Sequence, residues 1–187
     1  MWANVYFFLK RKSPIPPEDI LKQGVAVKLK VNVDFHERYG LKLIIEDIDS
    51  SFTMGQLEMQ RQAILKAIQE RGLIRKNAET HLPVVVQRLA VISSDRAAGY
   101  KDFIKHLEDN FYGYDIQVDL FEAAMQGQQV ETEISACLDK VEKALDDYDA
   151  VAIIRGGGGR TDLAAFDNLN LAVRIARFPI PVLIGIG

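Results

Sequence analysis

The residue types best suited to chemistry in this 187-residue sequence form one short run, in which four consecutive glycines lie between two arginines. The run consists of Arg155, Gly156, Gly157, Gly158, Gly159 and Arg160. Glycines between a buried strand and a helix let the backbone approach a ligand closely, and amides at a helix N-terminus attract anions. An arginine beside such amides suits bidentate contact with a phosphate. The run therefore predicts a phosphate-binding loop, and the alternative is a tight strand-to-helix turn with two solvated arginines.

The spacing of the glycines excludes two nucleotide-binding motifs. A dinucleotide fingerprint needs glycine at its first, third and sixth positions, but the sixth position counted from Gly156 is Thr161, and counted from Gly157 it is Asp162. A P-loop needs a glycine followed by lysine and a hydroxyl residue, and the sequence contains no such triplet.

A second small polar loop, Ser93 and Ser94, follows another predicted strand and leads into a predicted helix. The serines and the helix amides could bind a phosphate oxygen, and either serine could equally be the helix N-cap. Asp102 lies early in that helix, where the helix dipole also favours an acidic surface residue. Because ligands bind beyond the carboxyl ends of parallel strands, we expect both loops at one site, together with residues 122–127 and 185–187.

Other polar residues show no pattern typical of a catalytic or metal centre. His36, His81 and His106 are scattered over different predicted elements, and Cys137 lies on an apolar helical stripe, so no metal site is predicted and Cys137 is expected in the core. The paired serines also lack the G-x-S-x-G frame of a nucleophile elbow.

Composition narrows the class of protein further. With 48% hydrophobic residues the chain is not expected to be disordered, and no run of about 20 apolar residues suggests a membrane span. A single cysteine rules out an intrachain disulfide, and there is no signal-peptide pattern. We therefore expect a cytoplasmic protein with no membrane partner.

The net charge of −3 averages over unlike halves. Residues 1–89 carry 14 basic and 10 acidic residues, a net charge of +4, whereas residues 90–187 carry 9 basic and 16 acidic residues, a net charge of −7. Because nucleic-acid binding depends on local basic surface, the overall acidity does not exclude a nucleic-acid partner.

The elements that position the polar loops repeat one theme after residue 88. Apolar strands at residues 89–93, 116–121, 150–154 and 182–186 alternate with amphipathic helices at residues 97–107, 130–145 and 162–177. Continuous apolar strands separated by helices predict a parallel sheet covered on both faces by right-handed crossovers. The predicted fold class is α/β, a Rossmann-like three-layer domain with a mainly parallel sheet.

The sequence before residue 88 does not show this strand-helix repeat and predicts a different structure. Residues 25–33 alternate strictly, and a turn at Tyr39 and Gly40 leads to a second strand at residues 41–48, which predicts an antiparallel hairpin. Since a lone hairpin is only marginally stable, it should belong to a larger sheet or a small β-domain. A linker helix is predicted at residues 56–71, with Gly72 as its left-handed C-terminal cap.

Several blocks of the sequence, in their order, resemble the large subunit of exodeoxyribonuclease VII. The blocks are LAVISSDRAAGYKDF (89–103), FEAAMQG (121–127), IIRGGGGRTDLAAFDN (153–168) and FPIPVLIGIG (178–187). In addition, GVAVKLKVNVDFHERYGLKLIIEDID (24–49) is similar to the last strands of that family's N-terminal OB-fold, and the helix after it to the family's connector. The resemblance implies a partial OB-fold at 1–54, a linker at 55–87 and a Rossmann-like catalytic core at 88–187.

The resemblance also implies an activity. It implies a single-strand-specific exonuclease that hydrolyses DNA from both ends to short oligonucleotides, needs no divalent metal or other cofactor, and acts with copies of a small subunit. The family's functional aspartate and arginine fall on Asp102 and Arg155. Ser93, Ser94, the four glycines and Arg160 would then contact DNA phosphates. Lys28 and Lys30, on the polar face of the hairpin, could track a single strand or simply form a solvated face.

The sequence departs from the family at a few positions. The family continues with Gly-His-x-x-Asp after the last strand, and this sequence stops at Gly187, so we expect an inactive fragment that also lacks the start of the OB-fold. Within the match, Gly159 replaces a serine, Ala164 a tryptophan and Asp95 a proline. A different class of function stays open: a non-catalytic Rossmann-like module that binds a nucleotide or phosphate ligand at the glycine loop.

Overall fold

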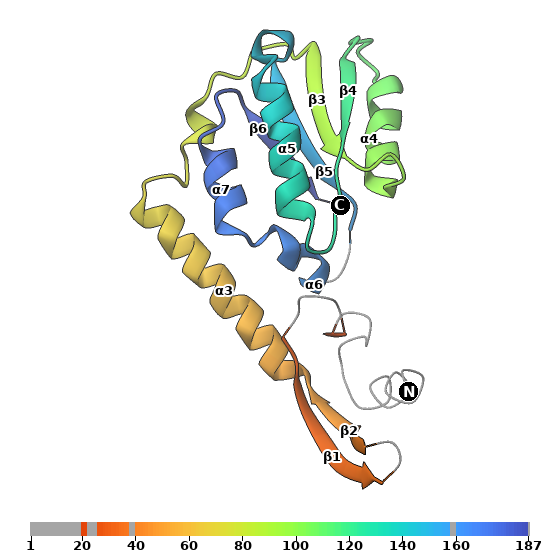
Figure 1. Cartoon of the computed structure of the whole chain (residues 1–187). Coiled ribbons are helices and arrows are strands. Elements are labelled where there is room, and N and C mark those ends of the chain that lie inside the picture. The colour runs from red at the N-terminus through yellow and green to blue at the C-terminus, as the bar shows by residue number, and fades with distance from the viewer. Residues whose placement is uncertain (1–19, 22–25, 38–39, 158–159, 187) are drawn as a thin grey trace. The chain divides into compact units, whose positions relative to one another are not determined.

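The computed structural model describes residues 20–21, 26–37, 40–157 and 160–186. The chain divides into two compact units, residues 1–62 and 63–187 (Figure 1). The functional boundaries that the sequence suggested, at residues 54 and 87, remain predictions.

The first unit contains the predicted antiparallel hairpin. Strand β1 (Lys28–His36) pairs with strand β2 (Gly40–Asp49), and β1 begins three residues later than the alternation predicted. The register shifts after Lys30, where Glu46 is the extra residue of a β-bulge. The predicted turn residue Tyr39 lies outside the described residues.

One face of the hairpin is apolar and, among the described residues of its unit, exposed. Its members are Leu29, Val31, Val33, Phe35, Leu41 and Leu43. Among the described residues of this unit, Ile20 and Ile48 form a small buried cluster with partly buried neighbours. An exposed apolar face is typical of a hairpin that pairs or packs with more β structure. The OB-fold assignment itself remains a prediction.

Helix α3 (Ser50–Glu70) begins six residues earlier than the sequence predicted. The reason is a cap: the Asp49 carboxylate accepts hydrogen bonds from the Phe52 amide at 3.1 Å and from the Ser51 hydroxyl at 2.5 Å. These two bonds lower the pKa of the Asp49 carboxyl below its usual value.

The C-terminal end of α3 is the predicted glycine cap. Gly72 has a positive φ of 65°. Its amide donates to the Gln69 carbonyl at 2.9 Å, and the Leu73 amide donates to the Ile68 carbonyl at 3.0 Å. This pair of bonds is the Schellman arrangement, which explains why glycine suits the position.

The second unit is built on a four-stranded parallel sheet, as predicted. Its strands are β3 (Arg88–Ser93), β4 (Gln117–Glu122), β5 (Ala150–Arg155) and β6 (Val182–Ile186). Their spatial order is β4-β3-β5-β6, and every neighbouring pair is parallel. The chain therefore reverses direction across the sheet between β3 and β5, which creates a topological switch point at their carboxyl ends.

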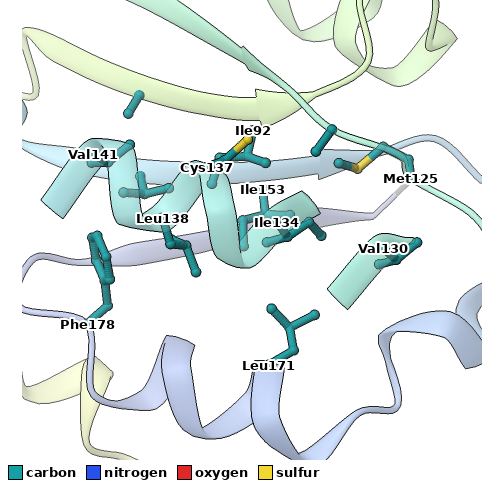
Figure 2. Packing of buried hydrophobic residues seen from close by; sticks show 13 residues of the cluster. Ile92, Met125, Val130, Ile134, Cys137, Leu138, Val141, Ile153, Leu171 and Phe178 are labelled. Carbon is teal, nitrogen blue, oxygen red and sulfur yellow. The ribbon is translucent and has the colours of Figure 1, made fainter. Parts of the chain in front are cut away.

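Helices cover both faces of this sheet, which confirms the three-layer prediction. Helix α4 (Ala98–Glu108) packs Tyr100 and Phe103 against one face. Helices α5 (Val130–Glu142) and α7 (Leu169–Ala176) cover the other face (Figure 1). Figure 2 shows the core under α5, where Ile134, Cys137 and Leu138 pack toward the sheet.

Two predicted helices have different boundaries in the structure. The second ends at Glu142, and Leu145 lies instead in a short 3-10 helix, Leu145–Asp147, while still packing against the core. The third is not continuous: α6 (Arg160–Leu163) and a 3-10 turn (Ala164–Phe166) precede α7.

The break before α7 has a local cause. The Asn168 side chain accepts hydrogen bonds from the amides of Asn170 at 2.8 Å and Leu171 at 3.1 Å, so Asn168 is a helix N-cap and starts a new helix. Phe166 before the break and Ile175 after it pack against the same core, so the apolar periodicity alone could not reveal the break.

The segment after α3 belongs to the second unit, and the side chain of Asn77 fastens it to the sheet. Asn77, in a short 3-10 helix (Asn77–Glu79), donates to the carbonyls of Phe178 at 3.1 Å and Ile180 at 3.0 Å. The side-chain oxygen of Asn77, Oδ1, accepts a hydrogen bond from the Val182 amide at 2.8 Å. Asn77 therefore fastens the segment to the start of edge strand β6.

Candidate functional site

The carboxyl ends of β3, β4 and β5 meet at one hollow, which we call the strand-end cleft. It has a volume of about 900 Å³. It is lined by Ser94, Asp95, Arg96, Ala97, Ala98, Glu122, Ala123, Ala124, Met125, Gln126, Glu133, Arg155, Gly156 and Gly157. Three of the four loops selected from the sequence thus meet at one place. This agrees with the rule that ligands bind beyond the carboxyl ends of parallel strands.

Arg155 is the central side chain of this cleft. It ends strand β5 and is only 6% exposed. Its Nε donates to the Met125 carbonyl at 3.4 Å, and its Nη2 lies 3.8 Å from the Asp162 carboxylate. Its Nη1 is buried and has no hydrogen-bond acceptor among the described residues. A buried cationic donor without an acceptor is costly, so an incoming anion would be stabilised there.

The glycine loop begins in the cleft. Gly156 and Gly157 line it directly, Gly158 and Gly159 lie outside the described residues, and Arg160 is the first residue of α6. No sequence signal marked Gly99, yet a Cβ at this position would lie 2.8 Å from both the Cα and the N of Gly156. The start of α4 and the glycine loop are therefore in contact at a distance that only glycine allows.

The two serines have different surroundings. Ser93 is fully buried, and its hydroxyl donates to the Ile154 carbonyl at 2.6 Å, which ties β3 to β5. Ser94 lines the cleft. The expectation that one of them caps the helix is wrong, because the N-cap of α4 is Ala97, which makes no side-chain cap bond. Because no side chain caps the first turn of α4, its backbone amides can donate hydrogen bonds to another acceptor. An anion in the cleft would be a suitable acceptor.

Asp102 does not line the strand-end cleft. It is exposed and lies on the second turn of α4, in a neighbouring hollow of about 460 Å³ that we call the α4 groove. This groove is lined by Leu89, Gly99, Asp102, Phe103, His106, Ala152, Ile154, Arg155, Leu183, Ile184, Gly185 and Ile186. Arg155 lines both hollows, so the structure brings Asp102 and Arg155 to one groove and Arg155 and the glycines to the other.

Two further groups lie at these hollows: Glu133, which was not selected from the sequence, and His106, to which the sequence assigned no role. Glu133 accepts a hydrogen bond from the Ala124 amide at 2.7 Å, which orders the loop between β4 and α5 that forms one cleft wall. In the α4 groove, His106 Nδ1 lies 2.7 Å from the backbone carbonyl of Asp102. The only available sequence signal for Glu133 was an acidic residue in the first turn of a helix.

The hairpin lysines are engaged with carboxylates of their own unit. Lys28 Nζ lies 3.5 Å from Asp49, and Lys30 Nζ lies 3.2 Å from Glu46. Both lysines remain largely exposed, so these ion pairs contribute little and can exchange for phosphate contacts. A DNA-tracking role for them remains a prediction.

Other expectations concern metals, cysteine and membranes. Within the described part of the chain, no group of three or more histidine, cysteine, aspartate or glutamate side chains is arranged to hold a metal ion. Metal independence of the chemistry remains a prediction. Cys137 is buried, as expected, and burial raises the pKa of its thiol. None of the described helices is both long and apolar enough to cross a membrane.

Comparison with known proteins identifies the family. Residues 73–187 match the family described as "Exonuclease VII, large subunit". Exodeoxyribonuclease 7 large subunits from Deinococcus radiodurans and Campylobacter hominis are 31% and 29% identical to the chain, over 100% and 99% of its length. The corresponding Xanthomonas oryzae protein is 30% identical over 89% of the chain.

The matches extend over both units, so they include the hairpin as well as the strand-end cleft. The chain covers 46% of the Deinococcus radiodurans protein, 47% of the Campylobacter hominis protein and 37% of the Xanthomonas oryzae protein, so it spans less than half the length of these relatives. The family match includes both serines, Asp102 and the arginine with its glycine loop. On this evidence the chain belongs to the exonuclease VII large-subunit family.

Proposed function

We propose that this chain is the major part of the nuclease core of a single-strand-specific exodeoxyribonuclease and that its strand-end cleft holds a DNA phosphate. The observation that carries the proposal is the Arg155 guanidinium, which is buried at the cleft wall with Nη1 lacking an acceptor among the described residues. A DNA phosphate supplies both the charge and the acceptor oxygens that this donor needs.

The proposed reaction is hydrolysis of a phosphodiester bond. Negative charge develops on the phosphate oxygens as water attacks, and Arg155 with the backbone amides of Gly156 and Gly157 would stabilise it. Asp102, in the α4 groove that Arg155 also lines, would accept or supply a proton. We propose that this chemistry needs no divalent metal, as the family resemblance implies.

Ser94 and the uncapped first turn of α4 extend the proposed phosphate contacts along the cleft. Ser93 is left out of this set, because its hydroxyl is already bonded inside the sheet. Lys28 and Lys30 would add non-specific backbone contacts from the hairpin.

The finer features of the activity are proposals of the same kind. They are attack from both ends of single-stranded DNA, release of short oligonucleotides, and assembly with exonuclease VII small subunits. We also propose that the chain is inactive by itself and that it acts in the cytoplasm, where its single cysteine suits a reducing environment.

The experiment uses the chain extended past Gly187 by the segment that follows in its relatives, together with the small subunit. We expect it to degrade single-stranded oligonucleotides labelled at either end in the presence of EDTA, and to leave duplex DNA intact. Arg155→Ala should reduce this cleavage to a low residual rate. An extended protein that is folded and never degrades single-stranded DNA would contradict the proposal.

A second candidate function has one observation in its favour. Asp102 lines a different hollow from the glycines, so the strand-end cleft could hold a nucleotide or other phosphate ligand without performing chemistry. Stoichiometric binding of a mononucleotide by the extended protein, without hydrolysis of any DNA, would favour this non-catalytic module.

A further inference from the structure

The guanidinium of Arg155 has partners on two of its three nitrogens. Nε donates to a backbone carbonyl, that of Met125 in the loop after β4. Nη2 faces the Asp162 carboxylate from α6, at 3.8 Å. The third nitrogen, Nη1, has no acceptor among the described residues. The loop after β4 and helix α6 therefore both act on the orientation of this planar group, and the orientation decides where Nη1 points.

Asp162 is well placed to exert this control. Its side chain is 19% exposed and that of Arg155 is 7% exposed, so water screens their attraction less than it would at the surface. Asp162 also comes shortly after the glycine loop in the sequence, and Arg155 immediately precedes it. The ion pair therefore joins the residues on either side of the glycine loop. A shift of Asp162 would change the position of the Arg155 guanidinium.

A carboxylate beside an anion-binding arginine has a cost. It offsets part of the positive charge that attracts a phosphate, so removing it would strengthen phosphate binding if net charge alone mattered. Asp162 also offsets the cost of burying the Arg155 charge. Its effect on the reaction itself can come from geometry, because reaction rates fall steeply when a charge-stabilising group is displaced by about 1 Å.

We propose that Asp162 is a positioning residue for the proposed reaction, holding Arg155 so that Nη1 meets the phosphate oxygen on which charge develops. The inference rests on the proposed function and assigns Asp162 no contact with the DNA. It separates two properties: attraction of the phosphate, which Asp162 weakens, and alignment of the arginine in the transition state, which Asp162 provides.

The test is a double-mutant cycle in the extended protein with its small subunit, read as kcat and KM on a single-stranded oligonucleotide. Asp162→Asn keeps the size of the side chain and removes its charge. We expect kcat to fall about tenfold or more, with KM unchanged or lower. In an Arg155→Ala background, adding Asp162→Asn should change the residual rate less than twofold, because its effect passes through Arg155.

Asp115→Asn is the matched control. Asp115 is an exposed aspartate in the loop before β4, at the edge of the sheet opposite the strand-end cleft, and its removal makes the same change in net charge. We expect wild-type kcat and KM for this variant. Thermal unfolding midpoints of all variants show whether each one is folded.

The outcomes separate the inference from the function on which it rests. If Arg155→Ala cleaves normally, or if the unsubstituted protein does not cleave at all, the proposed function fails and the inference with it. If Arg155→Ala cleaves only at a low residual rate but Asp162→Asn cleaves at the wild-type rate, only the positioning role is overturned. A folded Asp162→Asn that raises KM with kcat unchanged also contradicts it, because alignment acts on the transition state.

Discussion

At the scale of single residues, the structure assigns different tasks to side chains that the sequence could only group together. Arg155 lies at the wall of both hollows, whereas Ser93 is bonded inside the sheet and Asp102 faces only the α4 groove. Sequence spacing predicted that these residues lie near the carboxyl edge of the sheet. It could not tell which side of the sheet each one faces, because that depends on tertiary packing.

The close contact of Gly99 with the glycine loop predicts that a larger residue at this position destabilises the protein. Gly99→Ala places a methyl group 2.8 Å from backbone atoms of Gly156, which are not free to rotate away. We expect a loss of about 1–3 kcal/mol in the free energy of unfolding, because backbone must shift to admit the methyl group. Weaker binding of a single-stranded oligonucleotide should accompany it, measured on the same preparation.

Gly55→Ala is the matched control for this prediction. A Cβ at Gly55 meets nothing within 4 Å, and the residue lies in the body of α3. Alanine there should stabilise the protein by about 0.5–1 kcal/mol, because alanine is the better helix former. Equal effects at both positions would show that the close contact of Gly99 has no energetic consequence.

Asp149 is expected to stabilise the folded protein by an amount that depends on pH. Its carboxylate accepts hydrogen bonds from the amides of Gln87 and Arg88, both at 2.8 Å, and these bonds lower its pKa. Because the folded pKa is the lower one, the stabilisation is complete above the ordinary value of 3.8 and is lost as pH falls through the folded pKa.

Asp149→Asn tests whether the stabilisation by this carboxylate is lost as pH falls. The variant should be less stable than the unsubstituted protein at pH 7, by on the order of 1 kcal/mol, since an amide oxygen accepts less strongly than a carboxylate. The difference should shrink toward pH 3, as measured by urea unfolding at a series of pH values. A difference that grows on acidification would contradict the assignment.

At the scale of elements, the strands of the parallel sheet were predicted more accurately than the second and third helices of the same unit. All four strands of the parallel sheet lie within one residue of their expected bounds, because short apolar runs flanked by polar loops mark the strands of a parallel sheet well. Helix ends depend on caps instead. Asp49 starts α3 early and Asn168 divides the last helix, and neither cap changes the apolar periodicity.

Asn77 connects two elements and makes the prediction at this scale. Its side chain makes three hydrogen bonds, all to backbone groups between Phe178 and Val182. Asn77→Ala should cost about 2 kcal/mol in the free energy of unfolding, since it leaves those groups without partners in a partly buried place. It should also increase amide exchange at Val182, measured by hydrogen–deuterium exchange.

Asn170→Ala is the matched control for Asn77. Asn170 is exposed on the first turn of α7, and its backbone amide, which the substitution retains, donates to the Asn168 cap. We expect a change within about 0.5 kcal/mol, as for most surface substitutions. Similar losses for the two variants would mean that the Asn77 bonds add no stability.

At the scale of the whole molecule, sequence and structure agree on an α/β unit with a polar strand-end cleft, and on a separate hairpin before it. The family followed from ordered blocks of sequence, and the match over residues 73–187 bears it out. The distribution of the site over two hollows could not be predicted, since it results from α4 lying on one face of the sheet and the loops ending at its edge.

The central claim is that Arg155 holds a DNA phosphate. The most direct measurement is the equilibrium affinity of the chain for a fluorescently labelled single-stranded oligonucleotide, titrated at several salt concentrations with and without Arg155→Ala. We predict that the variant binds at least about tenfold more weakly and that its salt dependence falls by roughly one phosphate contact. A folded Arg155→Ala chain with unchanged affinity and unchanged salt dependence would contradict the claim.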